Sequence, residues 1–318
     1  MRATKWIASM FRPRSFGLGL LAVGGLVAGG ARPAEAALLS YEPFDYTVGS
    51  DVLGQNGGGG WTGAWRAHAG GAVPVGSFVT GTGSLAGPSG LPTQGNHAIM
   101  SGEFGTTQPA RDYSDFAGTD GTRLYYSFIG QRLGNPVAAA NEFPRGANAG
   151  LFDTTHPTRP ERVGVGNSSN AATNAWSIIP EGSGANRVAS SEAFSTLAWQ
   201  VLRIDFVGDA TTPDNAYLFI NPDPAVEPDI SAAAAQSLGA FAFSNTDFVR
   251  AFVGNTSGAS PYAVMIIDEI RLGTDYAAMS STQVVPEPVS SLAIAGLGVA
   301  GLFYRRLRSR ASESTQSA

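Results

Sequence analysis

Short runs of alternating apolar and polar residues, bounded by Gly, Pro, Asn and Asp, fill the middle of the chain. This pattern is typical of β-strands joined by turns. The clearest predicted strands cover residues 124–129, 199–207, 216–220, 248–253 and 262–272. In the second of these, Leu202, Ile204 and Phe206 fall on one face. Arg203 and Asp205 fall on the other, as expected of an antiparallel strand with one buried side.

Between residues 37 and 284, no stretch keeps the 3.6-residue apolar period of a helix, and only residues 232–235 are expected to form one helical turn. Repeated short strands separated by turns predict one all-β domain over residues 37–283, an antiparallel jelly-roll β-sandwich. The glycine-rich segments 57–60 and 81–95 are predicted to be surface loops.

The first 36 residues follow the order of a secretory signal peptide. Basic residues come first, an apolar run covers residues 16–28, and Ala34-Glu35-Ala36 follows. A small residue, any residue and a second small residue form the site that signal peptidase recognises, so we expect cleavage after Ala36. The alternative is a retained membrane anchor, but the apolar run is short and interrupted by glycines.

The other end combines three features in order: Pro286-Glu287-Pro288, an apolar stretch over residues 289–304, and a cluster containing Arg305, Arg306 and Arg308. Such a stretch is just long enough to cross a bilayer as a single hydrophobic helix. The arginines would then stay cytoplasmic. A polar tail, residues 311–318, follows.

Residues 284–310 therefore resemble the PEP-CTERM sorting signal, which has a Pro-Glu-Pro motif, a hydrophobic segment and an arginine cluster. The resemblance implies that exosortase, a membrane protease-transpeptidase, processes the chain near Pro286, Glu287 and Pro288. It also implies transit through the inner membrane to the cell surface or to an exopolysaccharide (biofilm) matrix. An ordinary tail anchor is the alternative.

Net charge narrows the possible partners, and cysteine content shows how the domain is stabilised. Between residues 37 and 284 the chain has 11 arginines and 22 acidic residues, a formal charge of −11. Nucleic acid is not an expected partner, because that affinity comes mainly from Lys and Arg on phosphates. The chain has no cysteine, so disulfides do not stabilise the exported domain.

A second resemblance covers the β-rich region. Residues 41–46, 54–58 and 60–65 are similar to the start of secreted concanavalin A-like (LamG-like) jelly-roll domains, and residues 202–206, 217–222 and 267–273 are similar to their late strands. This supports the predicted fold. It assigns no activity, since one sandwich fold hosts lectins, glucanases and structural modules.

Trp61 and Trp65 flank the glycine-rich loop and are candidates for binding carbohydrate. In an extended segment, residues four apart lie on one face, where two indoles could stack on sugars. The alternative is that both rings belong to the core, as large aromatic residues usually do.

Asp268 and Glu269 are the most tempting carboxylate pair. Adjacent strand residues point to opposite faces, so these two are not expected to serve one sugar as a glycosidase pair. The alternation places Asp268 on an apolar face, where a carboxylate must be hydrogen-bonded, paired or bound to metal. Two interpretations stay open: bonds to loop amides, or a ligand of a structural Ca²⁺. No other cofactor is expected.

These patterns predict an exported, non-catalytic surface or matrix protein sorted by exosortase. The alternative is a lectin-like module that binds matrix polysaccharide. A third hypothesis is a glycoside hydrolase or lyase whose carboxylates come from separate strands.

Overall fold

The computed structural model describes residues 38–133, 145–154, 161–168, 174–209, 211–242, 245–254 and 262–283. The predicted signal peptide, the sorting segment 284–310 and the polar tail lie outside these residues. Among the described residues, none of the helices has both the length and the apolar character needed to cross a membrane.

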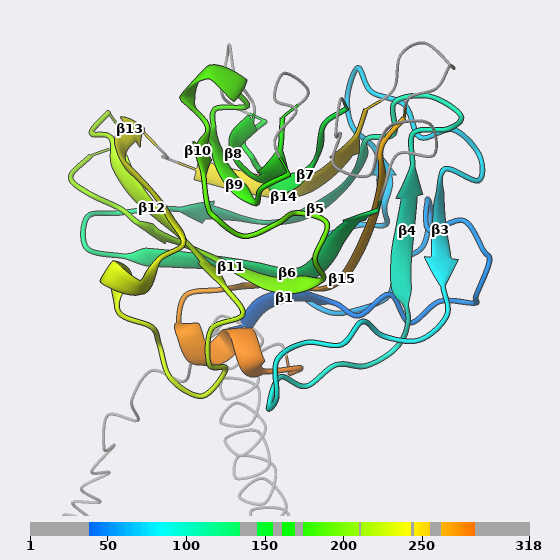
Figure 1. The fold of residues 1–318 in the computed structure, drawn as a ribbon, viewed down its shortest axis with the longest axis horizontal. Helices are drawn as coiled ribbons and strands as arrows, with labels where there is room; N and C mark the ends of the chain where they lie inside the picture. The colour runs from blue at the N-terminus through cyan, green and yellow to red at the C-terminus, as the bar shows by residue number, and fades with distance from the viewer. Residues whose placement is uncertain are drawn as a thin grey trace, which may run out of the picture. The chain divides into compact units, whose positions relative to one another are not determined.

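One antiparallel sheet has eight strands (Figure 1). They are β1 (Leu38–Glu42), β3 (Phe78–Gly81), β4 (His97–Ser101), β6 (Arg123–Leu133), β11 (Ala198–Asp205), β12 (Asp214–Ile220), β13 (Ala235–Phe241) and β15 (Val264–Gly273). The order across the sheet is β13-β12-β11-β6-β15-β4-β3, and β1 also pairs with β15.

The second antiparallel sheet has seven strands. They are β2 (Arg66–Ala67), β5 (Pro109–Ala117), β7 (Ala147–Phe152), β8 (Glu161–Asn167), β9 (Ser177–Pro180), β10 (Val188–Ala189) and β14 (Asn245–Val253). Their order is β10-β9-β8-β7-β14-β5-β2. The described helices are three short 3-10 turns, η1 (Gly184–Asn186), η2 (Ile230–Ala232) and η3 (Tyr276–Ser280).

The all-β, antiparallel part of the predicted fold is confirmed. The five predicted strands correspond to β6, β11, β12, β14 and β15, and η2 overlaps the start of the predicted helical turn at 232–235. In β11, Leu202 and Ile204 are fully buried in the core between the sheets. Arg203 and Asp205 lie on the opposite face, where the Arg203 Nε donates to Asp205 Oδ1 at 2.6 Å.

The main core lies between the two sheets. Strands of the eight-stranded sheet contribute residues such as Leu202 and Met265, and the seven-stranded sheet contributes Leu151, Val163 and Val249. Each fully buried side chain of this size stabilises the fold by about 1.5–3 kcal/mol relative to leaving it exposed. Burial of the inward positions on both sheets therefore fixes which side chains face outward.

The outer faces of the two sheets differ. The eight-stranded sheet carries a second apolar cluster that includes Tyr125 and Trp199, packed against Leu85 and Leu91 of the β3–β4 loop and against Tyr276 of η3. Loop 81–95, predicted as a glycine-rich surface loop, thus covers a sheet face. On the outer face of the seven-stranded sheet, the described apolar cluster is limited to Ala110, Phe152 and Phe248. That face is where polar side chains gather.

Candidate functional site

The strand register aligns one row of outward positions across the seven-stranded sheet. Arg66 lies opposite Ala110, which lies opposite Arg250. Arg250 in turn lies opposite Gly150, and Gly150 opposite Gly164. Neighbours in such a row are close enough for their side chains to interact. Because the two glycines have no side chain, the middle of the row is open beside Arg250.

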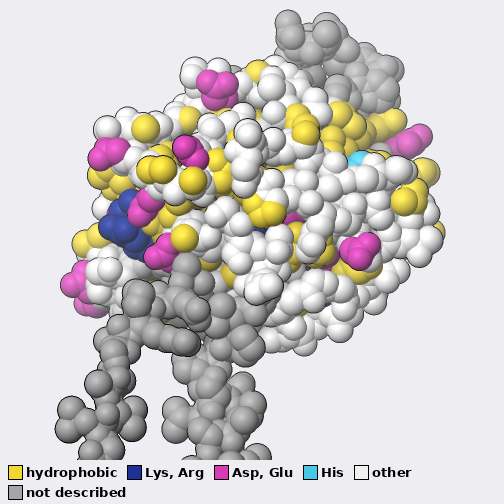
Figure 2. All heavy atoms as spheres, turned by 90° about the horizontal axis from the view of Figure 1, so that it is seen from below, with side chains coloured by type: hydrophobic (Ala, Val, Ile, Leu, Met, Phe, Trp, Pro, Cys, Tyr) yellow, Lys and Arg dark blue, Asp and Glu magenta, His cyan; other side chains and the backbone are white. Residues whose placement is uncertain are grey.

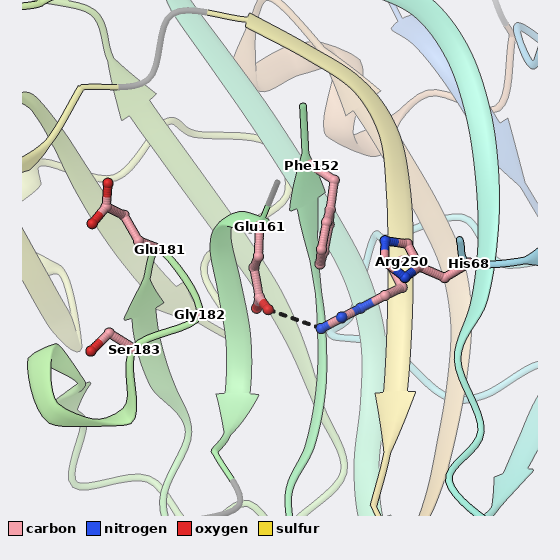
Figure 3. A pocket seen from close by; sticks show the side chains of 7 residues that line it. All are labelled: His68, Phe152, Glu161, Glu181, Gly182, Ser183 and Arg250. Atoms are coloured by element: carbon pink, nitrogen blue, oxygen red, sulfur yellow. Dashed lines mark hydrogen bonds and ion pairs between the residues drawn. The ribbon is translucent and has the colours of Figure 1, made fainter. Parts of the chain in front are cut away.

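Arg250 fills part of this opening and pairs with Glu161 at the start of β8 (Figure 3). The Arg250 Nη2 donates to Glu161 Oε2 at 2.9 Å, and the two side chains are 11% and 15% exposed. Burial raises the pKa of Glu161, and the nearby Arg250 opposes that shift. Burial likewise lowers the pKa of Arg250. Each charge therefore depends on the other for its stability.

Two glycines make room for the Glu161 carboxylate. A Cβ added at Gly164 would lie 2.8 Å from Glu161 Oε1, and one added at Gly182 would lie 2.8 Å from Oε2. Contacts that short are not tolerated without movement, so a side chain at either position would displace the carboxylate. The carboxylate thus lies in a notch formed by the absence of two side chains.

Aromatic rings continue the site towards β2. Phe152 and Phe248 lie 5.0 Å apart, and the His68 ring is 5.5 Å from Phe152 and 5.6 Å from Phe248. The Arg250 guanidinium lies over Phe152 at 4.2 Å, and Arg66 lies over Phe248 at 5.2 Å. These cation–π contacts hold both guanidinium groups in place without using their hydrogen-bond donors.

His68 is the half-buried ring of this cluster. Burial, together with the positive charges of Arg250 and Arg66, lowers the pKa of His68 to about 4. The imidazole is therefore neutral at pH 7, with one nitrogen able to donate a hydrogen bond and the other able to accept one.

These residues surround an open pocket of about 400 Å³. Its walls are formed by His68, Phe152, Glu161, Glu181, Gly182, Ser183 and Arg250 (Figure 3). Three buried polar atoms have no hydrogen-bond partner among the described residues: Glu161 Oε1 and Arg250 Nε, whose residues line the pocket, and Asn148 Oδ1 on the neighbouring strand β7. Buried polar atoms are normally paired, and an unpaired one in a pocket is a place for a ligand group or a water molecule.

The two tryptophans predicted as a sugar platform lie elsewhere. Trp65 is 2% exposed and packs against Phe44 and Phe78 in the core, while its Nε1 donates to Glu42 Oε2 at 2.9 Å. Trp61 is partly buried against the same core, and its Nε1 donates to the Tyr41 carbonyl at 2.9 Å. The prediction of a two-ring platform is therefore wrong, because Trp65 has no face open to a ligand.

Asp268 forms bonds to loop amides, one of its two predicted roles. Its Oδ2 accepts from the Leu85 N–H at 2.8 Å and from the Ser84 hydroxyl at 2.6 Å, and its Oδ1 accepts from the Glu269 N–H at 2.8 Å. Within the described ranges, no three His, Asp or Glu side chains come together as a metal site. The fully buried Asp268 thus holds the β3–β4 loop against β15.

The expectation that Asp268 and Glu269 point to opposite faces is wrong. The register of β15 against β6 shifts between Asp268 and Arg271, and Glu269 has a φ of 55°. This β-bulge turns both carboxylates to one side. The Ser84 hydroxyl lies 2.6 Å from Asp268 Oδ2 and 3.4 Å from Glu269 Oε1. Glu269 is also bonded to Arg271 at 2.5 Å and to the Tyr41 hydroxyl at 2.8 Å. Asp268, Glu269, Arg271 and Tyr41 are buried, so the pair is enclosed beneath the loop.

No family model matches this chain, and no curated protein matches it. Solved structures similar to it include an endo-1,3-β-glucanase from Streptomyces sioyaensis, at 11% identity and a TM-score of 0.42, covering 76% of this chain and 98% of that one. The carbohydrate recognition domain of Emp47p has 9% identity and a TM-score of 0.38, covering 74% and 97%. An endo-β-1,4-glucuronan lyase from the fungus Trichoderma reesei has 13% identity and a TM-score of 0.38, covering 62% and 90%. At these values the likeness assigns no activity to this chain.

Proposed function

We propose that this chain is an exported carbohydrate-binding protein that holds a polysaccharide on the outer face of its seven-stranded sheet. The observation that carries the proposal is the pocket around the neutral His68 and the Arg250–Glu161 pair. Ligand sites combine aromatic walls with a few fixed polar groups that set the orientation of the ligand. Sugars suit such a site, because each unit has an apolar face and several hydroxyl groups.

The charge of the protein supports a sugar rather than a nucleic acid as ligand. Between residues 37 and 284, 22 acidic residues outnumber 11 arginines, and the main group of basic side chains seen in Figure 2 has acidic side chains beside it. Nucleic-acid binding instead needs many cations along a phosphate backbone.

Location forms the second half of the proposal. We infer that signal peptidase cleaves after Ala36 and that exosortase processes the chain near Pro286, Glu287 and Pro288. The protein then resides on the cell surface or in the extracellular matrix. The order of the three C-terminal features supports this, as does the basic and apolar N-terminus. A polysaccharide matrix would place abundant ligand around the pocket.

Binding of the purified protein to a panel of soluble polysaccharides, measured by affinity electrophoresis, tests the sugar site. His68→Ala is expected to weaken binding on the order of tenfold, which corresponds to about 1.4 kcal/mol. Phe104→Ala removes a 57% exposed ring that does not line the pocket, so it serves as the control and should bind normally. The proposal fails if no polysaccharide binds, or if both variants bind as the wild type does.

The same polysaccharides should be assayed for reducing ends and for unsaturated products after incubation with the protein. A binding protein without catalytic activity leaves both signals at the level of the buffer. Release of either product, lost in Glu161→Gln, would make the pocket an active site instead.

The sorting proposal needs intact mass and fractionation from the native host. The wild type is expected to begin at Ala37 and to lack the residues after about position 285. A variant with Pro286→Ala, Glu287→Ala and Pro288→Ala should retain Arg305 and the rest of the tail. If both proteins keep the tail and remain in the inner membrane, the segment is only an anchor.

A further inference from the structure

We propose that the pocket selects uncharged sugar units and discriminates against uronates and other acidic sugars. This inference rests on the proposed sugar-binding function and deepens it. Two sets of observations lead to it: the pairing of every charge described in the pocket wall, and the kind of buried atoms that lack a partner.

The charges described in and beside the pocket are already compensated within the protein. Arg250 pairs with Glu161 at 2.9 Å, and Arg162 lies 3.8 Å from Glu181. At the β2 edge, Arg66 Nε donates to an oxygen of its partner Asp112 at 2.7 Å. His68 adds no charge at pH 7, because its pKa is lowered to about 4. None of these described groups is a spare cation for an acidic ligand.

An acidic sugar would therefore have to compete for Arg250. The Nε of Arg250 has no described partner, but it lies on the same edge of the guanidinium as the Nη2 that donates to Glu161. A ligand carboxylate that accepts from this edge must therefore displace the Glu161 carboxylate or lie against it, and the Glu161 side chain is only 15% exposed. A buried carboxylate that loses its cation is strongly destabilised. Incoming negative charge thus meets a penalty that a neutral sugar avoids.

The unpartnered atoms favour hydroxyl groups. Glu161 Oε1 and Asn148 Oδ1 are acceptors without a described donor, and Asn148 is 6% exposed. A Cβ placed on Gly164 would be 2.8 Å from the first oxygen and 3.8 Å from the second, so both oxygens lie next to this glycine. A hydroxyl can donate to such oxygens directly or through one water molecule. The third unpartnered atom, Arg250 Nε, is a donor, which either a hydroxyl or a carboxylate can satisfy. A carboxylate can only accept, so it leaves both oxygens without a donor, whereas hydroxyl groups can satisfy all three atoms.

Matched pairs of oligosaccharides with one backbone test this selectivity. The probes are glucan and glucuronan, mannan and mannuronan, and galactan and galacturonan, each of equal length. The wild type is expected to bind at least one neutral member, and the acidic member of that pair on the order of tenfold more weakly. His68→Ala identifies which binding occurs at the pocket.

Glu161→Gln keeps the size of the side chain and removes the negative charge that pairs with Arg250. It should raise the affinity for the acidic member, so that the preference for the neutral sugar falls on the order of tenfold at low salt. The matched control is Glu103→Gln, an exposed acid outside the pocket, which should leave the preference unchanged.

The outcomes separate the two proposals. If no member of any pair binds, or binding does not depend on His68, the sugar-binding function itself is refuted. If an acidic member binds as tightly as its neutral partner and needs His68, the pocket binds sugars but this inference is wrong. An unchanged preference in Glu161→Gln would also overturn it, since the Arg250–Glu161 pair would then not be the source of selectivity.

Discussion

Replacing Arg111 with Met is expected to destabilise the fold more than any single surface charge change. Arg111, on β5, forms a buried ion pair with Glu42 on β1, so it joins the two sheets; the two side chains are 1% and 0% exposed. The Glu42 carboxylate also accepts bonds from the Phe44 N–H at 2.7 Å, the Tyr46 hydroxyl at 2.8 Å and the Trp65 Nε1 at 2.9 Å.

The magnitude follows from this enclosure. Arg111→Met retains the apolar stem but leaves the carboxylate of Glu42 without its cation. Removing one partner of a buried pair typically costs about 3–5 kcal/mol. Burial already raises the pKa of Glu42, so the carboxyl takes up a proton in the variant and the loss stays near the lower limit. That is a large part of the about 5–15 kcal/mol by which domains are stable.

Equilibrium unfolding in urea, followed by tryptophan fluorescence, measures the loss. The control is Arg123→Met, because Arg123 is 46% exposed and its partners Asp205 and Glu227 lie 3.6 and 3.5 Å away. Exposed pairs contribute about 0–1 kcal/mol. A double variant that adds Glu42→Gln should lose less than the sum of the two single variants. Equal losses for Arg111→Met and Arg123→Met would refute the reasoning.

Three further outcomes are expected. Burial raises the pKa of Asp268 from 3.8 to about 8, so the folded protein holds a proton that the unfolded chain releases. The stabilisation from this proton is complete below about pH 4 and is lost as the pH rises towards 8. Asp268→Asn should flatten that part of a plot of unfolding free energy against pH. Gly164→Ala, whose backbone is outside the left-handed region, displaces the Glu161 carboxylate, so it should weaken sugar binding on the order of tenfold and also lower the urea midpoint. Gly63→Ala, with nothing near its added Cβ, should change neither. Sugar binding should persist at pH 6 and fall near pH 4, where the His68 imidazole gains a proton; a profile flat through pH 4 in titration calorimetry would show that its neutral form is not needed.

The sequence predicts the strands of one sheet better than those of the other. In β11, inward Leu202 and Ile204 alternate with outward Arg203, so polarity marks the period of two. In β8 the outward positions include Gly164 and Gly166, which show no polar signal between the inward valines. The strand was missed for that reason. Glycine at successive outward positions of a strand is itself a sign that a ligand or another backbone approaches the strand closely there.

The site could not be found by spacing, because it depends on strand pairing. His68, Glu161 and Arg250 are far apart in the sequence and meet only through the order β8-β7-β14-β5-β2. The bulge at Glu269 could not be predicted from the sequence for a different reason. A non-glycine residue with positive φ is uncommon, and simple alternation assumes that none occurs.

The pairing of β1 with β15 has a consequence for the surface attachment proposed above. Leu38, the first described residue, pairs with Gly273, and η3 packs on the outer side of the same eight-stranded sheet shortly before residue 283 (Figure 1). Both ends of the described chain thus leave from that sheet, whereas the pocket is on the outward side of the other sheet. If the protein is attached through the proposed C-terminal segment, the chain leaves the domain from the sheet that does not hold the pocket, so the pocket's own sheet face stays open to long polymers.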